Sequence, residues 1–178
     1  MSGSTQPRPS RSPAQFRLYY LLLLVLGAAA VASVTVGGLA PAPGLALLLG
    51  AGALLVIAEF TPVPMPSGGY VSAATVIELP LLLLAGPFWT TVVVLAVTVA
   101  VHGAIRRRPF VRVVHNMALF TVMLVAAGAV FSAMGGSFGL TRFPRDAGPM
   151  VAAGLVFFAV NSLGVSLAIG LTAGPSPW

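Results

Sequence analysis

Long apolar stretches, separated by short breaks rich in Pro, Gly or Arg, make up most of this sequence. A helix needs about 20 mostly apolar residues to cross the hydrocarbon core of a bilayer. The pattern therefore predicts six transmembrane helices, over residues 18–36, 43–59, 71–84, 87–105, 113–134 and 149–171. Pro and Gly at the borders of these stretches are typical of turns. The predicted fold class is all-α: a polytopic membrane helix bundle over residues 18–171.

The third stretch is the shortest of the six and contains Glu78 and Pro80. We expect it either to cross the membrane or to form a broken, re-entrant segment, which is tolerated where other protein covers its backbone. Residues 1–17, rich in Ser, Pro and Arg, are expected to be a disordered cytoplasmic tail. A cleaved signal peptide is the alternative, but the first apolar run is long and further apolar stretches follow it. Residues 172–178 are the carboxyl-terminal tail.

The composition excludes a soluble globular enzyme. Hydrophobic residues make up 58% of the chain and charged residues only 7%, against about 25% charged residues in an ordinary soluble domain. All nine basic residues are Arg, and with three acidic residues they give a net charge of +6. Because these arginines are scattered, no nucleic-acid partner is expected, and the lipid bilayer is the expected environment. The chain has no Cys, which excludes disulfides and thiolate chemistry.

The arginines also predict the orientation, because cytoplasmic segments have an excess of Lys and Arg. Most of them precede the first helix or lie between the fourth and the fifth: Arg8, Arg11, Arg17, Arg106, Arg107, Arg108 and Arg112. Arg142 and Arg145 fall between the fifth and sixth helices. With six crossings, both termini and the larger arginine group lie in the cytoplasm.

Four polar residues within or beside the apolar stretches are candidate ligand-binding residues: Glu59, Glu78, Asn116 and Asn161. A carboxylate near mid-membrane costs about 2.5–3.5 kcal/mol on insertion scales. Glu78 is therefore expected to face protein or water, as a ligand contact or proton carrier, or to lie at a shallow end of its segment. Glu59 opens a loop with three Pro and two Gly, either a rigid gate or a plain connection. The two Asn equally fit simple interhelical hydrogen bonding.

The remaining polar residues give no sign of catalysis. His102 and His115 lie on either side of the arginine run without matched Cys or carboxylate spacing, so no metal site is expected. Either could sense pH, although a solvated or hydrogen-bonded interfacial His is the simpler interpretation. Small residues such as Ala28 and Ala32 favour close helix packing. Phosphate-binding loops, nucleophile elbows and H-E-x-x-H motifs are missing from the sequence. The chain is therefore predicted to be no enzyme and to have no cofactor.

Several short motifs together resemble one family of bacterial membrane regions. They are EFTPV at 59–63, PSGG-VS at 66–72, LLLAGP at 82–87, RRRPF at 106–110 with His115-Asn116, FFAVNS at 157–162 and GPSPW at 174–178. Over about residues 45–178 the chain resembles the multi-helix sensor region that precedes HD-GYP phosphohydrolase or GGDEF cyclase domains in cyclic-di-GMP signalling proteins. Glu78 departs from this family, in which an apolar residue is expected.

This resemblance implies a sensor or scaffold module in the bacterial inner (cytoplasmic) membrane, crossing it several times. Its partners would be an unknown small ligand and either a signalling output domain or a second copy of the chain. Neither an HD pair nor a GGDEF motif is present, so the resemblance implies no turnover by these residues. A ligand would act by binding one packing of the helices better than another, and so shift the last helix.

Two other functions stay open. Six hydrophobic helices in 178 residues also resemble the substrate-binding subunit of energy-coupling-factor vitamin importers. In such a subunit Glu78 and the Pro/Gly loop would shape a pocket or gate. The amino-terminal tail, and the lack of a clear small-residue motif that would grip the coupling subunit, are evidence against it. The third hypothesis is a structural membrane protein with no ligand.

Overall fold

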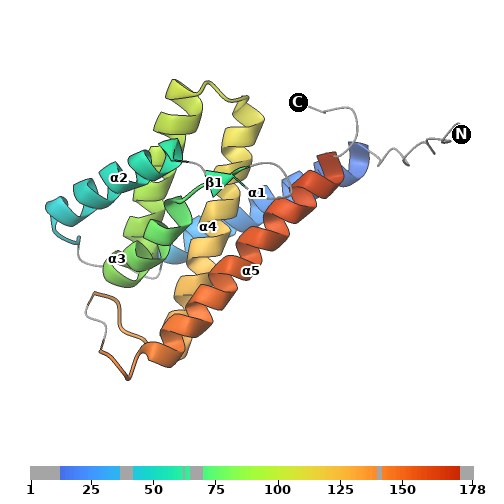
Figure 1. Ribbon diagram of the computed structural model, residues 1–178. Helices are drawn as coiled ribbons and strands as arrows, with labels where there is room; N and C mark the ends of the chain where they lie inside the picture. Colours follow the sequence, from blue (N-terminus) through green and yellow to red (C-terminus); the bar gives the residue numbers. More distant parts are fainter. Residues whose placement is uncertain (1–12, 37–41, 62, 65–69, 140–141, 173–178) are drawn as a thin grey trace, which may run out of the picture.

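The computed structural model describes residues 13–36, 42–61, 63–64, 70–139 and 142–172. The helices are connected by short segments, one of which contains an antiparallel pair of two-residue strands with Val63 opposite Val71. Figure 1 shows the arrangement of α1 (Pro13–Val36), α2 (Leu45–Phe60), β1 (Val63–Pro64), β2 (Tyr70–Val71), α3 (Ala74–Thr98), the π-helix η1 (Val99–Ile105), α4 (Phe110–Ala133) and α5 (Ala147–Thr172).

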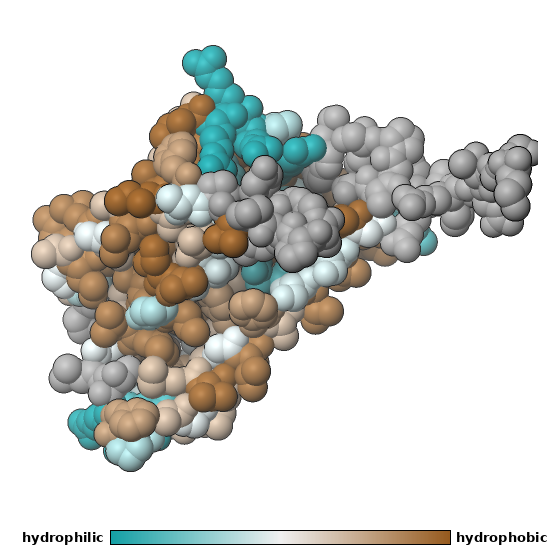
Figure 2. All heavy atoms as spheres, in the orientation of Figure 1, coloured by the Kyte–Doolittle hydropathy of each residue, from teal (hydrophilic) through white to brown (hydrophobic). Residues whose placement is uncertain are grey.

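The exterior of the molecule is apolar along its flank. Large side chains such as Leu21, Val25 and Leu155 are more than half exposed, and Figure 2 shows hydrophobic residues over the visible flank with hydrophilic residues gathered at the two ends. Among the described residues, four helical stretches are long and apolar enough to cross a membrane: Ala14–Thr35, Thr75–Ile105, Phe110–Ala133 and Ala147–Leu171. These features are those of a multi-pass helical membrane protein, because such a surface needs lipid around it.

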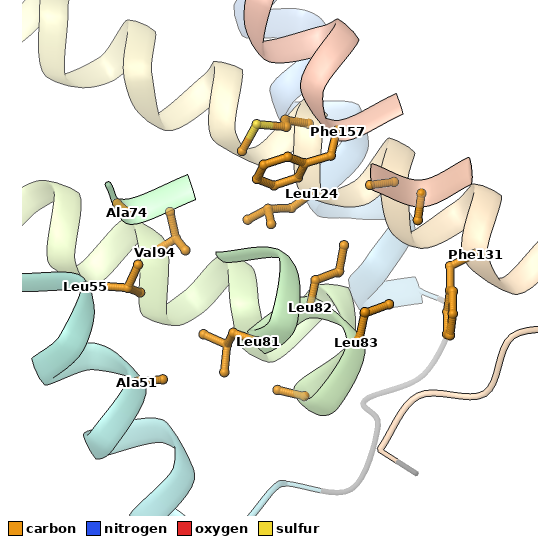
Figure 3. Packing of buried hydrophobic residues seen from close by; sticks show 14 of the residues in the cluster. Ala51, Leu55, Ala74, Leu81, Leu82, Leu83, Val94, Leu124, Phe131 and Phe157 are labelled. Atoms are coloured by element: carbon orange, nitrogen blue, oxygen red, sulfur yellow. The ribbon is translucent and has the colours of Figure 1, made fainter. Parts of the chain in front are cut away.

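α3 is not a straight helix, because Gly86 interrupts it with φ 75° and ψ 168°. Along one straight helix, Glu78 and Thr98 would lie about 30 Å apart. Both residues instead line one small cavity, together with Ala74 and Val94. Figure 3 shows Ala74 and Val94 beside each other. The chain therefore reverses direction at Gly86, and α3 is a helical hairpin.

The first arm of this hairpin spans residues 74–85, and the second arm spans residues 87–98 and continues into η1. The predicted number of full membrane crossings, six, is wrong. At about 1.5 Å per residue the first arm rises about 18 Å, against a hydrocarbon core of about 30 Å. The predicted stretch 71–84 is thus the short arm of a hairpin, and its Leu81 and Leu82 are covered by protein at 3% and 0% exposure. α2, with 16 residues, is a shorter apolar helix than the four long stretches.

α4 lies at the centre of the bundle. It packs against α1, α3 and α5, whereas α2 packs against α3. The core contains apolar side chains from α2, both arms, α4 and α5, among them Leu82, Leu124 and Phe157 (Figure 3). The contact between α5 and α4 depends on a glycine, because a Cβ on Gly164 would lie 2.3 Å from Leu119 Cδ1. This close approach holds the last helix against the central one.

α1 differs from its prediction in two respects. It begins at Pro13, so the expected disorder of residues 13–17 is wrong; Pro is well suited to the first turn of a helix, where its missing N–H leaves no bond unmade. Ala28 and Ala32 are exposed rather than packed. The close contact is made by Gly27, where a Cβ would lie 3.1 Å from the Ala118 backbone of α4. The expected tails at 1–12 and 173–178 lie outside the described residues.

The two groups of arginines lie at opposite ends of the molecule. Figure 1 places the start of α1, the end of α5 and the turn between η1 and α4 in its upper part, with the segment between α4 and α5 at the bottom. The upper turn contains the run of three arginines at 106–108, and the bottom segment contains Arg142 and Arg145. The side of the membrane that each end faces stays a prediction.

We expect Gly86→Ala to destabilise the protein, because φ 75° and ψ 168° lie in a region almost restricted to Gly, at a cost of about 1–3 kcal/mol. The new Cβ would meet Phe138 at an ordinary 3.8 Å, so backbone strain is the only cause. The matched control is Gly50→Ala in α2, where the added Cβ meets nothing within 4 Å. This variant should unfold at the same midpoint temperature as the wild type or at a higher one. Thermal unfolding in mild detergent measures both, and equal midpoints would contradict the reversal at Gly86.

Candidate functional site

Glu59, next to the end of α2, is the centre of a buried polar cluster. Its Oε1 accepts the Ser72 hydroxyl at 2.8 Å. Its Oε2 lies 2.9 Å from His102 Nε2 and 3.7 Å from Arg106 Nη1. Arg106 also donates to the Glu59 backbone carbonyl and lies over the Phe60 ring at 5.3 Å. A single carboxylate therefore joins α2 to the start of the hairpin and to η1.

Local backbone geometry positions these partners. Ser72 follows β2, and its Oγ accepts the Ala74 N–H at 3.1 Å, which satisfies a free donor at the start of the first arm. In η1 the Arg106 N–H bonds to the Val101 carbonyl, five residues back, at 2.8 Å. This wider turn is the π-helical form, which is frequent at functional sites. It brings His102 and Arg106 to the side of the chain that faces the end of α2.

Glu78 lies on the first arm, and only 2% of it is exposed. Within the described residues, its Oε2 has no hydrogen-bond partner. The side chain lines a cavity whose other walls include Glu59, Thr98 and Phe120. The space available to the centre of a water molecule is about 10 Å³, close to the smallest volume that holds one water. Two acidic side chains thus face one water-sized space.

The two acidic residues have different surroundings. Glu59 is next to Arg106 and His102, whereas the residues that line the cavity beside Glu78 include no basic group. Thr98, which could have donated to Glu78, donates instead to the Val94 carbonyl at 2.8 Å. The Arg106 guanidinium of the cluster is therefore engaged with Glu59, and no basic side chain lines the cavity beside Glu78.

A second polar cluster joins α1, α4 and α5. The Tyr19 hydroxyl donates to the Gly164 carbonyl at 3.0 Å and lies 2.9 Å from His115 Nε2. His115 Nδ1 lies 3.4 Å from Asn116 Oδ1. This arrangement holds three helices together and makes His115 a hydrogen-bonded structural residue.

The four predicted ligand-binding residues do not form one site. Glu59 and Glu78 face a common cavity. Asn116 belongs to the second cluster, beside His115. Asn161 lies half-buried on α5, and within the described part of the chain no hydrogen bond links it to either cluster. The candidate site is therefore the acidic pair with its polar partners.

The partners of Glu59 were not among the residues that the sequence pattern indicates. His102 lies 43 residues further along the chain, and no local pattern connects the two. One signal was available: His102 and Arg106 are four residues apart, which places them on one helical face at the same predicted end of the membrane as Glu59. Within the described ranges, no group of three His, Asp or Glu side chains is placed to hold a metal ion.

Comparison with known proteins adds no family assignment. No protein-family model matches the chain, and no curated protein or solved structure matches it either. The interpretation of the site therefore rests on its own geometry.

We expect Glu59→Ala to lower the free energy of unfolding by about 3 kcal/mol, because it leaves Arg106 and His102 without their buried acceptor. Ser72→Ala removes one hydrogen bond to the same carboxylate and should cost about 1 kcal/mol. Denaturation in detergent micelles, followed by circular dichroism, compares the two variants with the wild type. A Ser72→Ala loss as large as that of Glu59→Ala would contradict the central place of Glu59.

Proposed function

We propose that this chain is a membrane sensor or scaffold module of a bacterial signalling protein of the cyclic-di-GMP type, located in the inner membrane, whose output domain lies outside these residues. The motif resemblance supports this function. The observation that favours it most is the Glu59 cluster, which joins α2, the hairpin and η1 at the arginine-rich end of the bundle.

The cluster is well placed to pass a local change to the end of the chain. η1 is connected to α4 by the short segment 106–109, and α4 packs along α5. A shift of η1 relative to α2 would therefore move the start of α4 and, through the close contact at Gly164, α5. Such a shift needs a stimulus that stabilises one packing more than the other, and couplings of about 1–3 kcal/mol are usual.

The importer hypothesis is less well supported by the available space. The cavity beside Glu78 has room for about one water and not for a vitamin. A larger hollow of about 410 Å³ lies between α2 and the second arm, but its lining is apolar, with Leu49, Val56 and Val92 among the residues. An apolar hollow open to the flank suits a lipid chain better than a polar vitamin. Copurification with an ATPase pair would nevertheless favour the importer.

In this proposal both termini and the run of arginines at 106–108 lie in the cytoplasm, and the segment between α4 and α5 lies outside. The re-entrant first arm leaves that orientation unchanged, because it enters and its partner arm returns on the same side. α2 would reach the cytoplasmic surface at Glu59.

Single cysteines test this orientation on a background that has none. We expect an impermeant maleimide, added to intact cells, to label Ser137→Cys alone among variants at Ser10, Ser67, Ser137 and Ser176. Permeabilised cells serve as the control, because all four positions should then react. Labelling of position 67 or 176 from outside would contradict the proposed orientation.

A fused output domain tests the signalling role. We expect Glu59→Gln and Arg106→Ala, in a chain fused after Trp178 to a GGDEF cyclase domain, to change cyclic-di-GMP production several-fold per membrane-inserted molecule, because they alter the contact between α2 and η1. Val76→Ala, at a side chain that is 74% exposed on the first arm, is the matched control. Equal output from all of these chains would contradict a signalling role for the cluster.

A further inference from the structure

Two buried acidic groups lie outside the Glu59 cluster: Asp146, whose Oδ2 accepts the Arg142 N–H, and Glu78. Glu78 has an oxygen that lacks such a donor within the described residues. Glu78 is 2% exposed, its Oε2 accepts no hydrogen bond from the part of the chain that the structure describes, and the side chain faces the cavity that Glu59 also lines. An unpaired charge in such a place is far more costly than a neutral polar group. Glu78 therefore needs either a positively charged group beside it or a bound proton.

The residues that line the cavity include no positively charged side chain that could compensate Glu78. α2 contributes Glu59 and Leu55, the second arm contributes Val94, Val97 and Thr98, and α4 contributes Phe120. Glu59 is the only other titratable residue in this lining, and its Oε2 faces His102 and Arg106. Opposite Glu78 there is thus a second acidic side chain, which disfavours a second negative charge in the same space.

We propose that Glu78, with Glu59 across a water-sized cavity, forms a proton-binding site in which Glu78 carries an exchangeable proton. Glu59 keeps its negative charge, because the Arg106 guanidinium lies 3.7 Å from its Oε2 and Ser72 donates a hydrogen bond to its Oε1. The small size of the cavity is compatible with a proton as the bound species, because there is room for about one water molecule beside the two residues. This inference does not depend on the proposed signalling function.

The same contacts suggest how the proton reaches the surface. Glu59 Oε2 and His102 Nε2 are 2.9 Å apart, and the His102 side chain is 15% exposed. A proton that enters at His102 passes along this contact to Glu59, and the cavity between Glu59 and Glu78 has room for the one water that would carry it further.

A carbodiimide tests the site chemically. N,N′-dicyclohexylcarbodiimide is apolar and reacts with carboxylic acids: the acid proton moves to one reagent nitrogen while the carboxyl oxygen bonds to the central carbon. The resulting O-acylisourea rearranges to a stable N-acylurea, with no leaving group and no oxidant. We expect the purified full chain in detergent to gain one adduct at Glu78, read by intact mass and peptide mapping, with labelling that falls as the pH rises.

Two variants serve as controls. Glu78→Gln should lose the adduct, and its elution from size exclusion should match the wild type if it folds. Glu59→Gln should keep the adduct on Glu78 but lose it at a lower pH, because the charge that favours the neutral form of Glu78 is gone. An adduct on Glu59 instead of Glu78, or labelling of Glu78 that ignores pH, would overturn the proposal.

Two further measurements cover the remaining outcomes. Protection from labelling by sodium chloride but not by choline chloride would show a monovalent cation site and overturn the assignment to a proton. If the reagent does not reach Glu78, infrared spectroscopy decides. The wild type should show the C=O stretch of a protonated carboxyl that shifts in D2O and is lost in Glu78→Gln, and an identical spectrum of the two proteins would overturn the proposal.

Discussion

The reversal of the chain at Gly86 determines where every residue of the candidate site lies. A φ of 75° with a ψ of 168° is open to Gly and almost closed to other residues, and Pro87 begins the second arm without a backbone donor to satisfy. At the tip, the Leu83 carbonyl accepts the Gly139 N–H at 2.9 Å, so the segment after α4 replaces a bond that the broken helix has lost. Unsatisfied backbone groups are scarcely tolerated in a membrane, and this contact removes one of them.

The reversal turns two distant stretches of the chain into the walls of one polar site. Glu78 comes to lie beside the second arm, and η1 then brings His102 and Arg106 to Glu59. Burial raises the cost of each charge, so the positive groups gathered around Glu59 stabilise it only while α2, the hairpin and η1 keep their positions. A site of this kind responds strongly to small shifts of its helices, which is why we connect it with signalling and with proton binding.

Much of the helical layout could be predicted from the apolar runs, because hydrophobic length and border Pro/Gly are local signals. α4, α5 and the second arm with η1 begin and end close to their predicted limits. The count of crossings could not be predicted, since the stretch containing Glu78 is apolar enough to cross and only its shortness indicated otherwise. The pairing of Glu59 with His102 depends on the fold across 43 residues. Asn116 and Asn161 were predicted as ligand-binding residues for the same reason as Glu78, because they are polar residues within apolar stretches. The packing of the helices places both of them outside the candidate site.

The position of the two arms can be measured directly with pairs of cysteines. Ala74 and Val94 line one cavity, whereas on a straight helix these residues would lie about 30 Å apart. A short bifunctional thiol reagent should therefore bridge Ala74→Cys and Val94→Cys within one molecule. It should not bridge Ala74→Cys and Leu84→Cys, which are closer in sequence but about 15 Å apart along the first arm. Failure of the first pair to bridge, in a protein that is otherwise folded, would contradict the hairpin and with it the site.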